Sequence, residues 1–587
     1  MKVTPFLLLM GLASSAAFAQ TPPAAPQVTT PISLALFPTR EFNVRDYGAK
    51  GDGVAVDSPA INQAIDAAAA AGGGVVRLPA GTYLSYTIHL RSNITLRLDK
   101  DTILLAGAPG AGGAYDPPEP NAFSQYQDGG HGHWMNSLIV GIGLDHVAIT
   151  GPGVIKGTGL NRGDGGPGNK AIALKNCRFV VLQDFWVLDG GHFALLASGV
   201  DDFLFDGVKT DTNRDSFDID CCRRGFITHC QLNSHNDDAL VLKTSFGLGE
   251  ARPCEDLVLT HCTVTGYDQG TFYDGTKLRA NPRAPDGDGP TGRIKFGTES
   301  DSAFRRISIS DCIFDHSRGL AFETVDGGII EDVSATNLTM TDINTAPIFF
   351  RIGNRARGPD HPPIGIIRRV LVSNVTATGV DPRFPILIAG LPDHPVQDVT
   401  LSNLHITSKG GFSLAMVASP PPGVGLGFSQ RGNRGGRGAG RGVAPALTGA
   451  LGGAPPDFAA GTAAPAPAPG TPGTTATPRG PRDPYAVPEN PTAYPEPSMF
   501  GLLPGYGVYA RHAANLTVQD VTFGFEKEDT RPVVVLDDVQ GSTFQQLQAQ
   551  RGTDAPYFVL RQVTAFTATG VPGLADTRLD NAPDTKL

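Results

Sequence analysis

The sequence predicts an all-β fold, a parallel β-solenoid with one short helix at its N-terminal end. A tetrad with the pattern apolar, any, polar, apolar closes one short strand-like run after another. At its closest the tetrad repeats after 23 residues (185 to 208) and after 22 residues (208 to 230), the size of one solenoid coil. The tetrads end at Phe185, Val208, Cys230, Cys262, Cys312, Leu338, Val375, Leu404 and Val521.

Composition agrees with a chain that turns often. The 587 residues include 73 Gly and 48 Pro, so long helices are not expected. A β-sandwich would also turn often, about every 8–12 residues, but it would produce no fixed tetrad. The repeat therefore favours the solenoid.

The one predicted helix lies in DSPAINQAIDAAAAAGGG, with Ser58 as N-cap, Pro59 at the first helical position and Gly72 just past its end. Its apolar face must pack on another element, which makes it a capping helix for the first coil. That face consists of Ile61, Ala64, Ile65 and Ala68.

Residues 1–19 have the features of an export signal: Lys2, an apolar run, and small residues at the end. We expect cleavage after Ala19 and a periplasmic or secreted protein. No later stretch approaches the ~20 consecutive apolar residues that a membrane helix needs, so we expect no membrane partner.

The solenoid pattern defines the domains. We expect a β-helix catalytic domain at 42–410 and its continuation at 494–570, in a protein that is a monomer. Between them, residues 411–493 are rich in Gly, Pro and Ala and predict a disordered insertion. Its Gly-Arg run could hold a polyanion, but its composition favours a plain linker, and a net charge of −10 argues against nucleic acid.

Seven cysteines leave at least one thiol unpaired. Several lie close to the aspartates described next, but their spacing is not that of a zinc site. Buried core thiols are favoured over disulfides, and either is favoured over a metal.

Three carboxylates occupy equivalent places in successive coils. Asp215 lies seven residues after Val208, Asp237 lies seven after Cys230, and Asp238 follows it. Equal offsets stack on neighbouring coils about 4.8 Å apart, so the three side chains should be neighbours. Three like charges so close will not all ionise freely, and one carboxyl should keep its proton to higher pH.

Paired carboxylates on a rigid surface suit glycoside hydrolysis, in which an acid protonates the leaving oxygen and a base activates water. By themselves they are weak evidence, because aspartates are common in turns, where they bond their own backbone. Other motifs therefore have to decide.

Three motifs occur in one order: Asn213-Arg214-Asp215, Asp237-Asp238 and Arg293-Ile294-Lys295. Together with the opening FNVRDYGAKGDG, they resemble the polygalacturonases of glycoside hydrolase family 28, in the pectin-lyase-like superfamily. The resemblance implies a single-stranded right-handed parallel β-helix over most of the chain.

The same resemblance implies roles. Asp237 would be the general acid, Asp215 and Asp238 would hold the attacking water, and the reaction would invert the anomeric centre. Asn213 belongs to the same motif. Arg293 and Lys295 would hold the carboxylate of an acidic sugar, although a salt-bridged strand edge is their ordinary alternative. No metal or other cofactor is implied.

One motif of the family, Gly-His-Gly, is missing. The equivalent position carries Gln269, and the literal Gly130-His131-Gly132 precedes the aspartates by several coils, so we expect it to lie elsewhere. His192 occupies the aspartates' own row one coil earlier, and Glu299 follows Lys295 by two strand steps. Gln269, His192 and Glu299 are therefore candidates to bind the substrate in place of the missing histidine.

The expected function is an exported glycosidase that acts on acidic plant cell-wall polysaccharides or oligosaccharides of the pectic, galacturonate-containing class. Rhamnogalacturonan and oligogalacturonide ends are the candidate substrates. The length of segments 105–135 and 274–292 suggests that they wall off one end of a cleft, which would favour action at chain ends. A Ca²⁺-dependent polysaccharide lyase and a non-catalytic carbohydrate-binding solenoid remain the alternatives.

Overall fold

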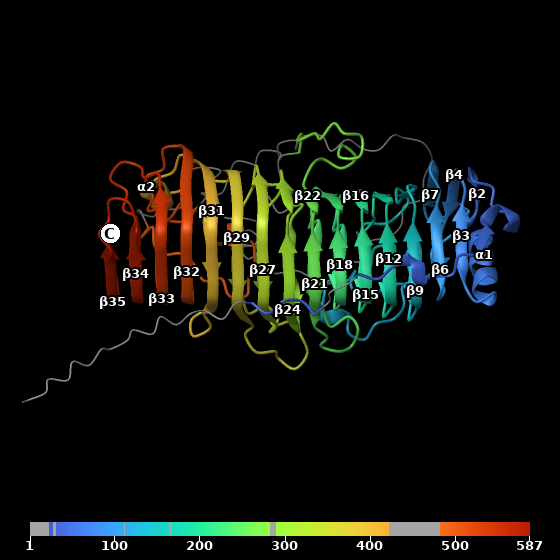
Figure 1. Ribbon diagram of the computed structural model, residues 1–587, viewed down its shortest axis with the longest axis horizontal. Coiled ribbons are helices and arrows are strands. Elements are labelled where there is room, and N and C mark those ends of the chain that lie inside the picture. Colours follow the sequence, from blue (N-terminus) through green and yellow to red (C-terminus); the bar gives the residue numbers. More distant parts are fainter. Residues whose placement is uncertain (1–22, 28–30, 111, 164–166, 282–288, 422–481) are drawn as a thin grey trace, which may run out of the picture.

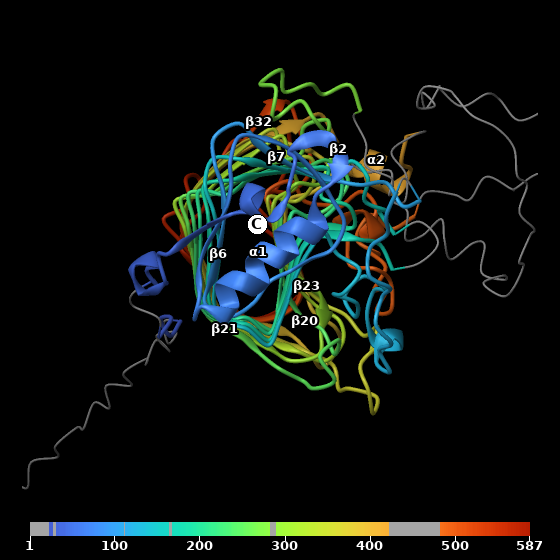
Figure 2. The same cartoon turned by 90° about the vertical axis from the view of Figure 1, so that its right-hand side faces the viewer.

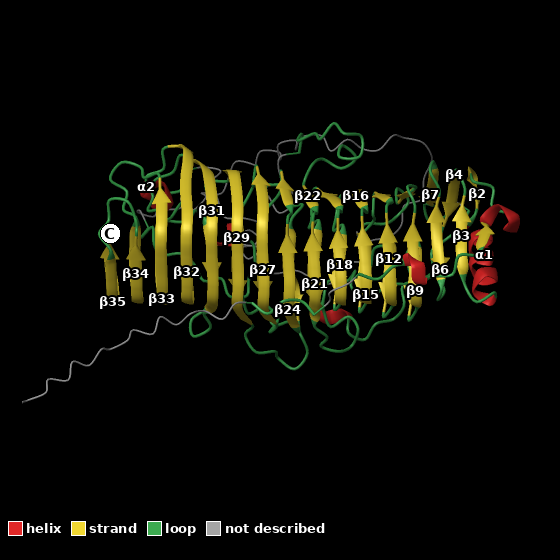
Figure 3. Ribbon diagram, in the orientation of Figure 1, coloured by secondary structure: helices red, strands yellow, loops and turns green. Residues whose placement is uncertain are grey.

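A computed structural model describes residues 23–27, 31–110, 112–163, 167–281, 289–421 and 482–587. Its strands stack into one long parallel coil, so the predicted all-β parallel β-helix is confirmed (Figures 1 and 3). The predicted export signal, 1–19, lies outside the described residues.

Each coil contributes strands to three rows, and each strand pairs in parallel with its equivalent in the next coil. The first row contains β1 (Glu41–Asn43), β3 (Gly74–Leu78), β6 (Ile94–Leu98), β9 (Asp145–Thr150), β12 (Arg178–Gln183), β15 (Asp201–Asp206), β18 (Arg223–Thr228), β21 (Cys254–Thr260), β24 (Ala303–Ser310), β27 (Ile329–Thr341), β29 (Ile366–Val380), β31 (Val396–Gly410), β32 (Val508–Lys527), β33 (Val534–Ala549), β34 (Phe558–Thr569) and the antiparallel β35 (Thr577–Lys586).

The second row contains β2 (Asp52–Val56), β4 (Gly81–Ser85), β7 (Thr102–Ala106), β10 (Val154–Lys156), β13 (Trp186–Leu188), β16 (Lys209–Thr212), β19 (Gln231–Ser234), β22 (Thr263–Thr265) and β25 (Ile313–Asp315). The third row contains β5 (Ile88–His89), β8 (Ile139–Ile142), β11 (Lys170–Lys175), β14 (Phe193–Ser198), β17 (Phe217–Asp220), β20 (Leu240–Thr244), β23 (Ile294–Ser300), β26 (Leu320–Thr324), β28 (Ile348–Ile352) and β30 (Ile386–Ala389).

The polar residue of the tetrad is the corner between the first two rows. It adopts a left-handed backbone in coil after coil, with φ of 56° at Asn337, 54° at Asn374 and 53° at Asn403. Asn and Asp tolerate this conformation better than other non-glycine residues. The corner side chains also bond along the stack, because Asn403 Nδ2 donates to Asn374 Oδ1 (2.8 Å) and Asn374 Nδ2 donates to Asn337 Oδ1 (3.0 Å).

The core is the interior of the coil, where inward-facing residues of equal offset stack. Phe322, for example, lies between Phe296 and Phe350, with ring centroids 5.0 and 4.6 Å apart. All seven cysteines are buried free thiols, so the preference for core thiols over disulfides is confirmed.

Helix α1 (Ser58–Ala70) covers the N-terminal end of the coil (Figure 2). Its predicted apolar face is fully buried. The predicted N-cap is wrong by one residue, because Ser58 is already the first helical residue and Asp57 precedes it. The Asp57 side chain makes no capping bond; its carboxylate accepts the Lys50 and Gly51 N–H groups and so fixes the chain entering the helix. Ser58 Oγ instead accepts the N–H of Tyr86.

Of the predicted insertion, residues 411–421 and 482–493 are described and the rest lie outside the described residues. The chain forms a short helix, α2 (Leu414–Ala418), after β31, and β32 resumes the coil at Val508. In between, residues 482–507 pack Met499, Phe500 and Leu503 against the outer face of the third row. The 3-10 turns are η1 (Leu34–Leu36), η2 (Val44–Tyr47), η3 (Ser124–Tyr126) and η4 (Pro497–Phe500).

Within the described ranges, no helix is long and apolar enough to cross a membrane.

The corner at Asn374 provides a stability test. Asn374→Val forces a β-branched residue into the left-handed region, which we expect to destabilise the fold by about 1–2 kcal/mol, and it removes both corner bonds. Asn374→Gly removes the same bonds but keeps the backbone conformation free of strain. Thermal unfolding should rank wild type above Asn374→Gly and Asn374→Gly above Asn374→Val, and equal melting temperatures for the two variants would contradict this account of the corner.

Candidate active site

Asp215, Asp237 and Asp238 come together as the sequence predicted. The turn after β16 carries Asp215, the turn after β19 carries Asp237 and Asp238, and these turns are neighbours because β16 pairs with β19 and β17 with β20. One oxygen from each carboxylate lies within 4.8 Å of the others. The Asp238 N–H donates to both Asp215 Oδ1 and Asp237 Oδ1, each at 3.1 Å, which fixes the group.

The three side chains differ in exposure. The side chain of Asp237 is 30% exposed, whereas those of Asp215 and Asp238 are each 4% exposed. A ligand arriving from solvent therefore meets Asp237 first, with the other two carboxylates behind it.

Asp215 and Asp238 also differ in proton affinity. Burial and the neighbouring charge of Asp237 raise the pKa of Asp215 well above its usual range. Burial opposes ionisation of Asp238 as well, but Lys295 and Arg293 overcome it and lower the pKa of Asp238 to about 2. The direction of these pKa shifts agrees with the expectation that one carboxyl keeps its proton to higher pH, and it points to Asp215.

Arg293 and Lys295 lie beside Asp238, at the start of β23. Arg293 Nε is 2.8 Å from Asp238 Oδ1 and Lys295 Nζ is 3.2 Å from Asp238 Oδ2. Both side chains are only 2% exposed, and both approach Glu323, at 3.7 and 3.6 Å. The two cations are thus paired within the protein rather than open to solvent.

Two partners of these cations were missed in the sequence, Tyr494 and Glu496. Glu496 binds the guanidinium of Arg293, 203 residues away, with Oε1 2.6 Å from Nη2 and Oε2 3.2 Å from Nη1. Lys295 Nζ donates to the hydroxyl of Tyr494 at 3.2 Å. Neither partner occupies a repeat position, so the periodicity that located the aspartates gave no signal for them.

His131 was expected to lie away from the aspartates, and this expectation is wrong. The long segment before β8 folds back along the coil and places His131 Nε2 2.8 Å from Asp218 Oδ2 and 2.7 Å from Lys243 Nζ. Lys243 Nζ is in turn 3.8 Å from Asp215 Oδ2. Although burial disfavours its charge, the carboxylates around Lys243, first Asp218, raise its pKa well above the usual range. A buried cation therefore supports the aspartates from behind.

The other candidates are spread around this centre. His192 is buried, with Nε2 3.5 Å from Asp128 Oδ2, and burial lowers its pKa. Glu299 is also buried, with Oε2 3.5 Å from Lys243 Nζ, so it supports the cluster from the inside. Gln269 Oε1 accepts from Arg162 at 2.8 Å and its amide bonds Asp189. The Asn213 carbonyl accepts the N–H of Asn236 at 3.0 Å, which ties the two aspartate turns together.

The three carboxylates are oxygen ligands of the kind that Ca²⁺ takes. Each one already has a cation, however: Lys243 at 3.8 Å for Asp215, Arg214 at 3.3 Å for Asp237, and Arg293 at 2.8 Å for Asp238. These fixed positive charges would repel a divalent ion. The donor set therefore does not fit a resident divalent cation.

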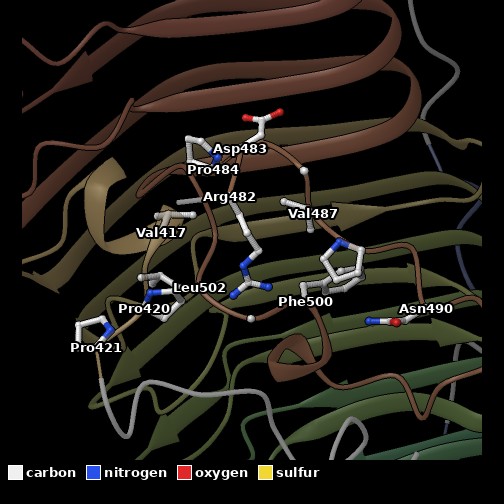
Figure 4. Close-up of a pocket in the computed structure, with 13 residues that line it drawn as sticks. Val417, Pro420, Pro421, Arg482, Asp483, Pro484, Val487, Asn490, Phe500 and Leu502 are labelled. Carbon is white, nitrogen blue, oxygen red and sulfur yellow. The ribbon is translucent and has the colours of Figure 1, made fainter. Parts of the chain in front are cut away.

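A separate pocket of about 500 Å³ lies beside α2 (Figure 4). Its walls come from both flanks of the predicted insertion and include Val417, Arg482, Val487 and Phe500. None of its lining residues is one of the aspartates or their cationic partners, so this pocket is distinct from the carboxylate cluster.

Known proteins match both the sequence and the fold. A family model described as "Rhamnogalacturonase A/epimerase, pectate lyase-like" matches residues 41–184. A probable polygalacturonase of Vitis vinifera is 23% identical over 393 residues, which cover 62% of this chain and 74% of the relative. The resemblance to the family 28 polygalacturonases is confirmed.

Two further matches show how much of the chain the similarity to known proteins covers. An exopolygalacturonase structure from Thermotoga maritima shares the fold, with a TM-score of 0.52 and 20% identity over 66% of this chain and 89% of that one. This match supports the right-handed coil. The mannuronan C5-epimerase AlgE4 of Azotobacter vinelandii is 52% identical, but only over 68 residues, or 12% of each chain. The polygalacturonase-like similarity is weaker in identity and far longer in extent.

The opposite pKa shifts of Asp215 and Asp238 predict opposite effects on stability. A raised folded pKa means that ionisation of Asp215 opposes folding as the pH rises, so Asp215→Asn should raise the melting temperature at pH 8. The lowered pKa of Asp238 means that its charge stabilises the fold above the unfolded value, so Asp238→Asn should lower the melting temperature there.

Both differences should shrink as the pH falls toward 3, and in a coil of this length about 1 kcal/mol would shift the melting temperature by ~1 °C. Melting curves of the two variants from pH 3 to 8 measure this. Destabilisation by Asp215→Asn at pH 8 would contradict the assignment of the retained proton.

Proposed function

We propose that this protein is an exported glycoside hydrolase that cleaves pectic, galacturonate-containing polysaccharides with its three aspartates. The observation that carries the proposal is the carboxylate cluster, in which the partly exposed Asp237 stands in front of the buried Asp215 and Asp238. The similarity to the rhamnogalacturonase A/epimerase family and to the probable polygalacturonase of Vitis vinifera supports the substrate class. Export is proposed from residues 1–19, and a monomer remains our expectation.

Asp237 is proposed as the general acid, because its exposed carboxyl can reach a glycosidic oxygen. At rest the shared proton is on Asp215. One oxygen of each carboxylate lies within 4.8 Å of the others, so this proton can pass from Asp215 to Asp237 and from there to the leaving oxygen. Protonation of the leaving oxygen then breaks the C–O bond.

Asp215 and Asp238 are proposed to hold the water that attacks the anomeric carbon. Once the proton has moved to Asp237, both are ionised, and Asp238 is kept so by Arg293 and Lys295. The water loses its proton to this pair as the new C–O bond forms. Lys243 holds Asp215 in place from behind.

Chain-end attack is proposed as the mode of action. The segment before β8 brings Asp128 toward Arg214 (3.9 Å) and His131 toward Lys243, so a long loop closes against the aspartate turns. A closed end favours release of short products.

The direct test is Asp237→Asn. We expect turnover of a pectic oligosaccharide to fall by roughly 10²–10⁴-fold, because the acid is lost, while the affinity for the oligosaccharide is kept. Asp184→Asn, the same chemical change at a corner outside the site, serves as the matched control and should leave both unchanged. Normal turnover by Asp237→Asn would show that Asp237 is not the acid.

Early products test the course of the reaction. The carboxylate oxygens lie closer than the ~6.5–9.5 Å usual for a two-carboxylate inverting pair. This spacing by itself favours retention, whereas the proposed water-holding roles require inversion, so the anomer of the first product decides between them. We expect ¹H NMR to show the inverted anomer first, in short products, with little early loss of polymer viscosity. A retained anomer would overturn the water-holding roles, and an unsaturated product with ultraviolet absorbance would indicate a lyase instead.

A further inference from the structure

The segment Glu489–Phe500, called the strap here, adds two side chains to the site. It begins in the last residues of the predicted insertion (411–493) and crosses the outer face of the third row before β32. Tyr494 and Glu496 lie at its centre and contact the cations beside Asp238.

Glu496 and Asp238 together accept hydrogen bonds from all three side-chain nitrogens of Arg293. Arg293 Nη1 and Nη2 both donate to Glu496, and Arg293 Nε donates to Asp238 at 2.8 Å. Arg318 Nη1 also lies 3.0 Å from Glu496 Oε1. The two-pronged contact is the one that a carboxylate ligand would make with this guanidinium, so Glu496 occupies that position itself.

Each cation around the subsite already has a carboxylate partner without a ligand. Arg293 and Arg318 pair with Glu496, and Lys295 pairs with Asp238. Glu323 lies beside Arg293 and Lys295, but burial raises its pKa to about 7. A uronate carboxylate placed here would gain no free cation and would meet Glu496 at close range.

The strap is anchored rather than poised to open. Arg351 Nη2 donates to the carbonyls of Glu489 (2.8 Å) and Asn490 (3.1 Å), and the Asn354 N–H donates to the Pro491 carbonyl (2.6 Å). Asn490 Nδ2 closes the turn on the Met499 carbonyl at 2.7 Å. Met499 and Phe500 are buried in an apolar cluster, and Figure 4 shows Asn490 and Phe500 on the pocket side of this segment.

Tyr494 offers an apolar surface at the same place. It is 46% exposed, although its hydroxyl is held by Lys295 and Lys295 Nζ lies 5.3 Å from its ring centroid. An exposed aromatic ring beside catalytic carboxylates is suited to stack on the C–H face of a sugar.

We propose that the strap makes the subsite beside Asp238 selective for an uncharged sugar ring, with Tyr494 as its stacking surface and Glu496 as the group that excludes uronates. The inference rests on the proposed hydrolase function and narrows its substrate class. The cleaved bond adjoins an uncharged sugar in a mixed pectic chain, rather than lying between two uronates.

Calorimetric binding in the inactive Asp237→Asn background tests this, with an oligogalacturonate and an oligosaccharide of alternating uronate and neutral sugar. Adding Glu496→Gln keeps the shape but frees the charge of Arg293, so the oligogalacturonate should bind about tenfold tighter at low salt, with the gain lost at high salt. Binding of the mixed oligosaccharide should stay within about twofold.

Tyr494→Ala and Tyr494→Phe test the stacking surface independently of any effect of Glu496→Gln on folding. Tyr494→Ala should weaken binding of the mixed oligosaccharide about tenfold while Tyr494→Phe retains it, with unchanged melting temperatures for both. Tight oligogalacturonate binding to the Asp237→Asn protein, unaffected by Glu496→Gln, would overturn the inference.

A failure of the proposed hydrolase function would give a different result from a failure of the strap's proposed role. If the wild-type protein hydrolyses no pectic polymer, the proposed hydrolase is wrong. If it hydrolyses homogalacturonan as fast as a mixed polymer, the hydrolase stands and the role of the strap is wrong.

Discussion

The parallel pairing of successive coils is the constraint on which the rest of this structure depends. Backbone bonding between β16 and β19, and between β17 and β20, holds the two aspartate turns at the strand spacing of about 4.8 Å. The like charges cannot move apart without breaking the coil. Burial, together with this closeness of like charges, raises the pKa of Asp215, and the surrounding cations offset the repulsion.

These cations come from several coils and define two sides of the site. Lys243 stands behind Asp215 with Asp218, His131 and Glu299, so it acts as a support. Arg293 and Lys295 stand beside Asp238 and are matched in turn by carboxyl groups. The strap supplies the last of these carboxylates, Glu496. The residues proposed for acid-base chemistry and those proposed for substrate selection therefore belong to one network of charges.

The sequence predicted whatever repeats with the coil. The tetrad located the corners, because its polar position is the left-handed residue, and equal offsets located Asp215 and Asp237 as neighbours. These features depend on local periodicity, which one sequence contains. Arg293 and Lys295 were found differently, because Arg293-Ile294-Lys295 resembles a motif of the family 28 polygalacturonases.

The features that escaped prediction depend on loops that leave the coil and return. His131 reaches Lys243 across 112 residues and Glu496 reaches Arg293 across 203, and no spacing in the sequence encodes either contact. Gln269 was placed by its offset, but its coil departs from regular length and its amide turns to Asp189 instead. Contacts made by a closing loop leave no repeat in the sequence, whereas contacts between stacked coils do.

The most direct measurement of the central claim is a crystal structure of the Asp237→Asn protein soaked with a pectic oligosaccharide. The account predicts a glycosidic oxygen within hydrogen-bond distance of residue 237, a sugar ring stacked on Tyr494, and Glu496 still bound to Arg293. A sugar bound only in the pocket beside α2, with the carboxylate cluster untouched, would contradict it.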